Sequence, residues 1–431
     1  MVSEPGAGNA PRVEPLDARL QAAGLEPLSS SAWIEVDLDV LEANARLVRG
    51  LLPPGARLGI VVKADGYGHG LVMAARAAIA GGADWLIVAA LDEARVLRRD
   101  GIDQPLLLTY PLPPSALDDA AELGVDVSVG DAASAEAAVR AGARRAERGR
   151  PALRVQLEID TGMTRGGAPA SVALAAAGRL AGAAGVELRG AWSHLASGED
   201  AAASHAQVER FEAVLRGLAD RGVSVSLRHM AASESLFRGT CPAYDLVRVG
   251  DAFYGGYDTT RPAAGPSPAA AAGLRPALSI KARAVRLVEA APGTRVGYGG
   301  TWVASRLSLV ATLPLGYADG WPRSASPGSS VLVRGRRVPV IGRVSMDAIG
   351  VDATDAGAIG PGDEFVLIGE QDGTLISAAE VAAARGTIAR EVFTALGPRL
   401  PRVYLRGARP VAVATLRGAS IVMTPGIASP E

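Results

Sequence analysis

The chain has 431 residues, of which 48% are apolar and 21% charged, with a net charge of −1, four histidines and a single cysteine, Cys241. This composition predicts a globular protein of about two domains and gives no sign of a nucleic-acid or membrane partner. It excludes an intramolecular disulfide, argues against a metal site of Cys and His, and suits the reducing cytoplasm, with no signal peptide or bilayer-spanning apolar run in view.

Residues 1–30 are rich in Pro, Gly and Ala and poor in large apolar side chains, which predicts a mobile N-terminal tail. From residue 31 to 274, strand-like runs alternate with Ala- and Arg-rich stretches of helical spacing. The runs are LGIVVKAD (58–65), WLIVAAL (85–91), PLLLTY (105–110), VDVSVG (125–130), ALRVQLEID (152–160), VELRGAWSHL (186–195), VSLRHMAAS (225–233) and YDLVRVGD (244–251). Eight runs without hairpin signals predict a parallel (β/α)8 barrel of the TIM type, with a doubly wound open sheet as the alternative.

An earlier strand, AWIEVDLD (32–39), precedes the first barrel helix and could belong to either domain. A Pro/Ala/Gly linker lies near 264–276. After it, short strands separated by Gly, Pro and Asp turns predict a mainly antiparallel, β-rich C-terminal domain over residues 275–431. Lys281 falls on one of these strands, and we expect its amine to reach solvent.

The first barrel run places Lys63 at a position where the pattern favours another apolar residue. Of the 44 basic residues only Lys63 and Lys281 are lysine, and the others are arginine. A lysine in an apolar strand loses hydration, so it is either paired or kept for its chemistry. Unlike arginine, a desolvated lysine can lose its proton and form a Schiff base. Lys63 is therefore a candidate nucleophile, with pairing to Asp65 or an extended strand-end lysine as the alternative.

In a parallel barrel the active site lies at the C-terminal ends of the strands, and several polar residues of this chain fall there. Besides Lys63 they are the segment DTGMTR (160–165), His194, the segment HMAAS (229–233), Arg248 and Gly250. Arginines, histidines and glycine-flanked turns at one mouth predict an anionic ligand, and barrels often hold phosphate near strands seven and eight. A phosphate beside a reactive amine fits pyridoxal 5'-phosphate.

These motifs carry a family resemblance. The segment VVKADGYGHG resembles the signature of the alanine racemase family of fold-type III pyridoxal-phosphate enzymes. Further segments resemble family motifs in family order between about residues 32 and 408, namely DTGMTRGG, QVERF, VRVGDAFYG, VGYGGTW, PLGYADGWPR and GRVSMDAIGVD. The resemblance implies racemisation of an amino acid, above all alanine, by a homodimer with shared active sites.

The resemblance also implies roles for individual residues. Lys63 and, from the partner subunit, Tyr298 would transfer protons on opposite faces of the substrate Cα, as racemisation requires. Lys63 would bind the cofactor covalently, and Arg165 would contact its phenolic oxygen. Arg248, supported by His194, would donate to the pyridine nitrogen. The phosphate would be held by Tyr67, Ser233, Gly250 and Asp251. The substrate would meet Arg165 and, from the partner, Tyr317 and Met346. No metal is implied.

Three positions depart from the family pattern. Where many members carry a carbamylated lysine seven residues before Arg165, this chain has Glu158, which supplies the same negative charge. The usual Asn before the phosphate serine is Ala232, and the tyrosine of the motif TIxYEV is Arg390 in TIAREV. A cation at position 390 could bind phosphate or a substrate side chain, or pair with Glu158. We expect Arg390 to change which amino acid is preferred.

Three other functions stay open. The enzyme could racemise another amino acid, such as serine. A decarboxylase of the same fold and cofactor would use a cysteine of the second domain, where this chain has Ser345 near the relevant position. A non-catalytic pyridoxal-phosphate-binding protein would typically be a barrel alone.

Overall fold

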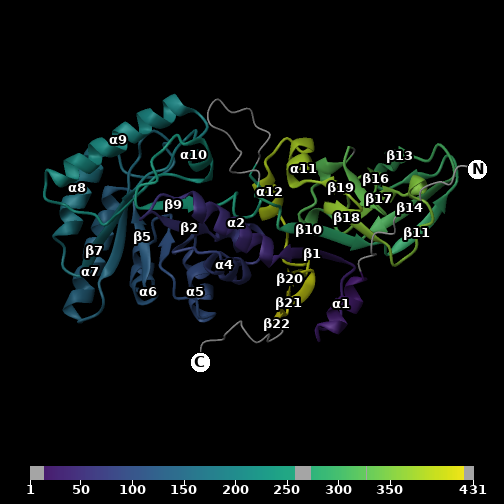
Figure 1. Cartoon of the computed structure of the whole chain (residues 1–431), viewed down its shortest axis with the longest axis horizontal. Coiled ribbons are helices and arrows are strands. Elements are labelled where there is room, and N and C mark those ends of the chain that lie inside the picture. Colours follow the sequence, from purple (N-terminus) through teal and green to yellow (C-terminus); the bar gives the residue numbers. More distant parts are fainter. Residues whose placement is uncertain (1–13, 258–272, 327, 422–431) are drawn as a thin grey trace, which may run out of the picture. The chain divides into compact units, whose positions relative to one another are not determined.

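The computed structural model describes residues 14–257, 273–326 and 328–421, which form two compact units (Figure 1). The barrel unit runs from Val40 to Arg275, and the sheet unit joins the residues up to Asp39 to those from Pro276 onward. Among the described helices none is both long and apolar enough to cross a membrane.

Eight parallel strands form the centre of the barrel unit. They are β2 (Arg57–Val61), β3 (Trp85–Val88), β4 (Leu106–Leu108), β5 (Val125–Val129), β6 (Leu153–Glu158), β7 (Val186–Trp192), β8 (Leu227–His229) and β9 (Leu246–Val249). Each strand from β2 to β7 pairs with the next, and β9 pairs with β2. Between β8 and β9 the ladder is reduced to a bridge between Ala232 and Arg248, so the barrel is nearly closed. This order confirms the predicted (β/α)8 barrel and excludes the open sheet, whose strand order would reverse.

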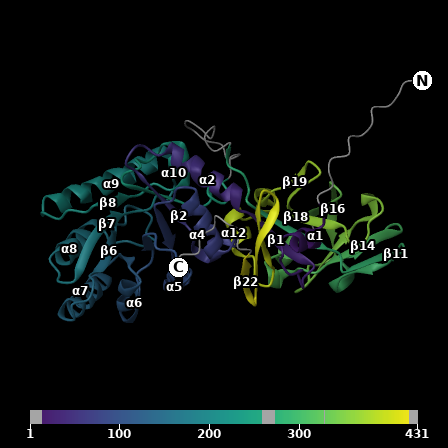
Figure 2. The ribbon, with the colours of Figure 1, turned by 60° about the horizontal axis from the view of Figure 1, so that its bottom comes forward.

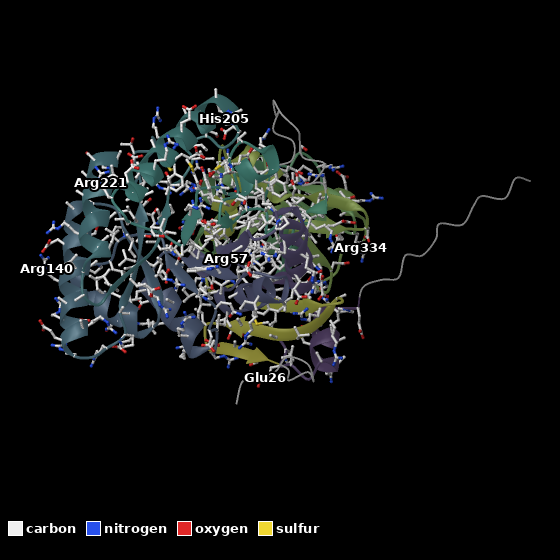
Figure 3. All side chains as sticks on the ribbon, turned by 60° about the vertical axis from the view of Figure 1, so that its left-hand side comes forward. Glu26, Arg57, Arg140, His205, Arg221 and Arg334 are labelled. Carbon is white, nitrogen blue, oxygen red and sulfur yellow. The ribbon has the colours of Figure 1, made fainter. Side chains whose placement is uncertain are left out.

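Helices follow the strands and cover the outside of the barrel (Figure 2). The main ones are α2 (Leu38–Leu51), α4 (Leu71–Ala80), α5 (Leu91–Arg99), α6 (Leu117–Glu122), α7 (Ala132–Glu147), α8 (Ala170–Ala181), α9 (Ala201–Ala219) and α10 (Ser233–Arg238). Their inward faces are rich in alanine, as at Ala135, Ala138 and Ala141 of α7, so the helices can approach the strands closely. Asp131 and Asp200 cap α7 and α9 by accepting a backbone N–H three residues on. Polar residues such as Arg140 and His205 occupy the outer faces (Figure 3).

The sheet unit contains one large, mainly antiparallel sheet, as predicted. Its strands follow the order β11-β14-β17-β16-β15-β18-β10-β1-β20-β21-β22, with β19 beside β18, and only β1 and β20 run parallel. Their bounds are β1 (Ala32–Asp37), β10 (Leu278–Arg283), β11 (Arg286–Ala290), β14 (Ser308–Leu313), β15 (Ser330–Val333), β16 (Arg336–Ile341), β17 (Ile349–Asp352), β18 (Glu364–Gln371), β19 (Thr374–Ile376), β20 (Arg402–Arg406), β21 (Arg409–Thr415) and β22 (Gly418–Ile421). A separate hairpin joins β12 (Arg295–Val296) to β13 (Trp302–Val303), and the unit also carries α11 (Ala378–Ala384) and α12 (Ala389–Thr394).

The prediction of a mobile tail over residues 1–30 is wrong for its second half, while residues 1–13 lie outside the described part of the chain. Helix α1 (Leu16–Ala22) buries Leu16 and Leu20 against Trp33 and Val403 of the sheet unit. The two leucines are four residues apart and share one helix face. The prediction failed because it rested on the average composition of residues 1–30, in which two leucines count for little.

The strand at 32–39, which the sequence could not assign, belongs to the sheet unit. Strand β1 pairs with β10 on one side and with β20 on the other. The barrel unit therefore begins at residue 40 and not at residue 31. Most of the predicted linker, residues 264–272, falls outside the described residues.

Lys281 does not reach solvent, so that expectation is wrong. Its side chain is only 15% exposed, and its Nζ lies 2.8 Å from Glu35 Oε2 and 3.6 Å from Glu364 Oε2. Glu35 Oε1 also accepts a hydrogen bond of 2.6 Å from Arg19 of α1. Burial alone would raise the pKa of Glu35, but Lys281 and Arg19 lower it below its usual value. Lys281 lies on β10, between β1 and β18, where the two carboxylates meet its amine.

Candidate active site

Lys63 begins a turn of left-handed helix, α3 (Lys63–Tyr67), just after the end of β2. Ala64, Asp65 and Tyr67 have φ angles of 55, 54 and 50°, and glycines occupy positions 66 and 68. Each non-glycine residue in this conformation costs roughly 1 kcal/mol or more, so surrounding contacts must hold the turn. The carboxylate of Asp65 accepts a backbone N–H of α4 at 2.9 Å, and Glu93 accepts the N–H of Ala64 at 2.6 Å.

The amine of Lys63 is half-buried. Burial, reinforced by the positive charge of Arg165, lowers the pKa of Lys63, and Glu93 opposes this effect. Among the described residues, no hydrogen bond or ion pair is formed by its Nζ, so the alternative pairing with Asp65 is absent. The structure therefore presents an amine that loses its proton more readily than a lysine in water.

A glycine-lined corner lies next to the end of β2. Gly250 follows β9, and its N–H donates to Ser233 Oγ at 3.2 Å. A methyl group added at Gly250 would lie 3.0 Å from the hydroxyl of Tyr67. The Tyr67 ring stacks on Tyr254 with centroids 4.9 Å apart, and the Tyr254 hydroxyl donates to Val61 O at 3.0 Å. The hydroxyls of Tyr67 and Ser233 thus lie close to the backbone of Gly250, and Asp251 follows in the same turn.

Arg248, on β9, is only 4% exposed and its guanidinium is held from several directions. Its Nη1 lies 2.5 Å from His229 Nδ1, and its Nη2 lies 3.1 Å from His194 Nδ1 and donates to a backbone carbonyl at 2.7 Å. The guanidinium carbon lies 4.9 Å from the ring centroid of Trp192. Burial lowers the pKa of Arg248 to about 10, against the opposing effect of the Glu158 carboxylate. No described group accepts its Nε–H.

Glu158 ends β6 and is 6% exposed. Burial raises its pKa to about 7, although Arg165 and Arg248 both favour the ionised form. Its carboxylate is covered by the following loop, where a methyl group at Gly166 would lie 2.9 Å from Oε1. The carboxylate accepts no hydrogen bond and forms no ion pair with any described residue. Arg165, exposed in the same loop, contributes charge without direct contact.

Tyr298 lies in the sheet unit on the short turn η3 (Tyr298–Gly300), which the β12–β13 hairpin carries. Gly297 and Gly299 on either side both have a φ of 73°, a conformation that favours glycine. The Tyr298 side chain is 68% exposed within its own chain.

Tyr317 and Met346 lie side by side in the sheet unit, since the N–H of Tyr317 donates to Ser345 O at 3.1 Å. Both side chains are about half exposed, at 43% and 52%. The buried carboxylate of Asp319, two residues after Tyr317, forms a bidentate ion pair with Arg399. Nε and Nη2 of Arg399 each donate to one carboxylate oxygen at 2.9 Å. Arg390, exposed, lies in the first turn of α12 in the same unit.

The sequence-predicted residues therefore divide between the units. One set lies at the C-terminal ends of the barrel strands: Lys63, Tyr67, Arg165, His194, Ser233, Arg248, Gly250 and Asp251. The other lies in the sheet unit: Tyr298, Tyr317, Met346 and Arg390. Among the described residues no group of three or more His, Cys, Asp or Glu side chains could hold a metal. Sequence reasoning counted His229 among the histidines around an anionic ligand, but it did not predict the contact of His229 with Arg248, which a histidine ending the neighbouring strand could have suggested.

The barrel residues fit pyridoxal phosphate. The unaccepted Nε–H of Arg248 suits the lone pair of a pyridine nitrogen. The corner at Gly250 brings the hydroxyls of Tyr67 and Ser233 to a backbone without a Cβ, and hydroxyl and backbone donors of this kind suit a phosphate. Lys63 supplies an amine of lowered pKa. The fold and the site together define a class of enzyme, in which a (β/α)8 barrel followed by a β-sheet domain carries pyridoxal phosphate on a lysine.

Comparison with known proteins gives the particular family. The family model of the alanine racemase N-terminal domain matches residues 36–258, and that of the alanine racemase C-terminal domain matches residues 277–404. The chain belongs to the alanine racemase family.

Individual relatives match over nearly their whole length. The alanine racemase of Symbiobacterium thermophilum is 41% identical over 376 residues, covering 86% of this chain and 96% of that protein. The alanine racemase of Thermobifida fusca is 39% identical over 392 residues, covering 89% and 100%. Among solved structures, alanine racemase from Bacillus anthracis with bound L-Ala-P has a TM-score of 0.83 at 32% identity, covering 90% of this chain and 98% of that one.

Proposed function

We propose that this protein is a pyridoxal-phosphate-dependent racemase that interconverts L- and D-alanine, and we expect it in the cytoplasm. One observation carries the proposal. Lys63, with its lowered pKa, follows the end of β2, and β2 pairs with β9, which carries Arg248 and leads into Gly250. An amine of lowered pKa, a cluster of hydroxyl and backbone groups at Gly250 and a donor for a ring nitrogen therefore share one end of the barrel.

Lys63 is the proposed base on one face of the substrate. When bound, pyridoxal phosphate withdraws electrons from the substrate Cα and so acidifies its proton. Lys63 would hold the cofactor through its amine, and the same amine, when free, would take or return the Cα proton. Only a neutral amine can accept a proton, and the burial that lowers the pKa of Lys63 increases that fraction.

The remaining barrel residues bind and orient. Arg248 donates its Nε–H to the pyridine nitrogen, with His194 behind the guanidinium. Because arginine keeps its proton, the ring nitrogen stays an uncharged acceptor, which limits side reactions such as transamination. Arg165 faces the phenolic oxygen and the substrate carboxylate. The phosphate is held by a set of hydroxyl and backbone donors at Tyr67, Ser233, Gly250 and Asp251.

The second base is proposed to be Tyr298 from another copy of the chain in a homodimer, with Tyr317 and Met346 lining the substrate side. The exposure of Tyr298 on a glycine-framed turn supports this arrangement. Mixing the inactive variants Lys63→Ala and Tyr298→Phe tests it. If sites are shared, each mixed dimer contains one intact site, and random exchange restores up to about a quarter of the activity. Failure to regain activity after verified subunit exchange would refute shared sites.

The decarboxylase alternative has little support, because the single cysteine, Cys241, lies in the barrel unit and burial raises its pKa to about 12. The binding-protein alternative lacks a use for the sheet unit. Incubation with L-alanine in deuterated water separates all three. Loss of optical rotation with deuterium at Cα and retained carboxylate is expected; release of carbon dioxide, or no change with any amino acid, would refute the racemase.

Arg390 is proposed to bias substrate choice toward amino acids with polar or acidic side chains, so serine is the first alternative substrate. Rates with alanine, serine and aspartate would be compared for the wild type and Arg390→Tyr. A preference that is identical in the two proteins would remove Arg390 from substrate selection.

A further inference from the structure

A chain of buried polar side chains runs through the interior of the barrel behind Arg248. The interior of such barrels is usually filled by branched apolar residues. Here Asp126 of β5, Gln156 of β6 and His229 of β8 point inward, and they are 1%, 0% and 0% exposed. They link Arg248 at one end to Arg189 of β7 at the other.

The distances define consecutive hydrogen bonds. Arg248 Nη1 lies 2.5 Å from His229 Nδ1, and His229 Nε2 lies 2.6 Å from Gln156 Oε1. Gln156 Nε2 donates to Asp126 Oδ2 at 2.8 Å, and Arg189 Nη1 donates to Asp126 Oδ1 at 3.1 Å. The bonds at both ends of the chain are charge-assisted, with the Arg248 guanidinium at one end and the Asp126 carboxylate at the other.

Only one assignment of protons satisfies the whole chain. A guanidinium can only donate, so His229 Nδ1 must accept, and the proton of the neutral ring lies on Nε2. That proton requires the oxygen of Gln156, which turns the Gln156 amide nitrogen toward the acceptor-only carboxylate of Asp126. A second proton on His229 would lie on Nδ1, where it would point at the guanidinium of Arg248, so that two donors would face each other. In agreement, burial and Arg248 hold the pKa of His229 well below its usual value.

The backbone is shaped to fit these side chains. Strand β7 has an extra residue opposite β6, since Val155 pairs with Leu188 and Gln156 with Gly190, which leaves Arg189 in a bulge. A methyl group at Gly190 would lie 2.9 Å from Gln156 Oε1, so only glycine leaves room for the amide. Trp192 stacks parallel to His229, with 5.9 Å between centroids.

We propose that Gln156, Asp126 and Arg189 are positioning residues that act on Arg248 through His229. They lock His229 as the neutral Nε2–H tautomer, which gives Arg248 the acceptor that fixes its guanidinium and aims its Nε–H toward the ligand side. The proposal rests on the proposed function only in taking that ligand to be pyridoxal phosphate. The four side chains behind Arg248 touch neither substrate nor cofactor.

The rival interpretation is a polar cluster that only stabilises the barrel, and three variants separate the two. Gln156→Met removes the acceptor of His229 at similar side-chain length. Gln156→Glu would lie next to Asp126, so the two carboxyls share a proton at low pH, and a protonated Glu can reproduce the donor and acceptor of the amide. Once that proton leaves at higher pH, the new carboxylate faces the Asp126 carboxylate with no proton between them, and their repulsion displaces it from its position between Asp126 and His229. The matched control is Glu187→Gln, which removes an exposed carboxylate 3.5 Å from Arg189 but leaves Asp126 in place.

Two readouts are measured from low to high pH on the full-length protein. Histidine-selective nitrogen NMR reports the protons of His229 directly, and four histidines are few enough to assign by substitution. Spectroscopic titration gives the Kd of pyridoxal phosphate. The charged groups facing the chain are Arg248 at His229, and Arg189 and Arg154 at Asp126, and burial raises the pKa of the Asp126 carboxyl itself.

We expect the wild type and Glu187→Gln to show His229 protonated at Nε2 alone throughout. Gln156→Met should shift the Nε2 proton signal, speed its exchange with water and raise the Kd of pyridoxal phosphate about 10-fold at every pH. Gln156→Glu should match the wild type at low pH and approach the 10-fold loss at high pH, with kcat falling and the KM for alanine unchanged. If Gln156→Met fails to fold, the pH dependence of Gln156→Glu decides alone.

The proposal is overturned if Gln156→Glu differs from the wild type by a constant factor at all pH values, or if His229 signals ignore both substitutions. Failure of the proposed function would be seen separately, because the NMR readout requires no racemase activity. A wild type without racemase activity but with the expected His229 behaviour would refute the function and keep the positioning chain.

Discussion

Replacing the buried carboxylate at the end of β6, by Glu158→Gln, should change how the stability of the cofactor-free protein depends on pH. Burial raises the pKa of Glu158 from 4.5 to about 7. The folded protein therefore binds this proton more tightly than the unfolded chain does. Glutamine has the same shape and does not titrate.

The sign and size follow from linkage. Between about pH 4.5 and 7 the folded state holds more protons at this site than the unfolded state, so the stability of the wild type falls as the pH rises through this window. The pKa change sets an upper limit of roughly 3 kcal/mol. Solvent screening at the open end of the barrel reduces the expected effect to about 1–2 kcal/mol.

The assay is urea unfolding of the wild type and Glu158→Gln at fixed protein concentration below and above this window. Relative to the variant, the wild type should lose about 1–2 kcal/mol on going to the higher pH. The control is Glu209→Gln, on the exposed face of α9, which should follow the wild type. A difference between wild type and Glu158→Gln that stays constant across the window would refute the raised pKa.

Three further predictions concern the site and the sheet unit. Gly250→Ala would place a methyl group 3.0 Å from the Tyr67 hydroxyl, so the Kd of pyridoxal phosphate should rise on the order of 10-fold in a spectroscopic titration. An unchanged Kd would show that the corner does not bind the phosphate. Ala64→Gly removes a side chain from a left-handed position and should stabilise the protein by roughly 0.5 kcal/mol in urea unfolding, whereas a loss of stability would contradict the strain. Glu35→Ala leaves Arg19 and Lys281 buried without their shared partner and should cost about 3–5 kcal/mol, and a loss below about 1 kcal/mol would argue against the cluster.

The barrel could be predicted because its strands are short apolar runs set between helical segments. This alternation continues through all eight strands from β2 to β9. The sheet domain could also be predicted, because Gly, Pro and Asp turns separate its short strands. The partners of β1 were not, because pairing with β10 and β20 depends on contacts across more than two hundred residues of chain. For the same reason the ion pair of Lys281 with Glu35 could not be seen in the local pattern.

The candidate site was predicted chiefly from residue types that are costly at strand ends, above all Lys63. The left-handed turn after it was beyond prediction, since only Gly66 and Gly68 hint at positive φ while Ala64 and Asp65 share it. The line from His229 to Asp126 was hidden for a different reason. Inward-facing polar residues on separate strands meet only once the barrel closes, and nothing in the local sequence marks them as neighbours.

The most direct test of the account is to find which amine carries the cofactor. The chain has only two lysines, so borohydride reduction of the protein loaded with pyridoxal phosphate, followed by peptide mapping, gives a clear result. We predict a single pyridoxyl group on Lys63 and none on Lys281. Label on Lys281, or a protein that stays colourless and unlabelled after pyridoxal phosphate is supplied, would contradict the account.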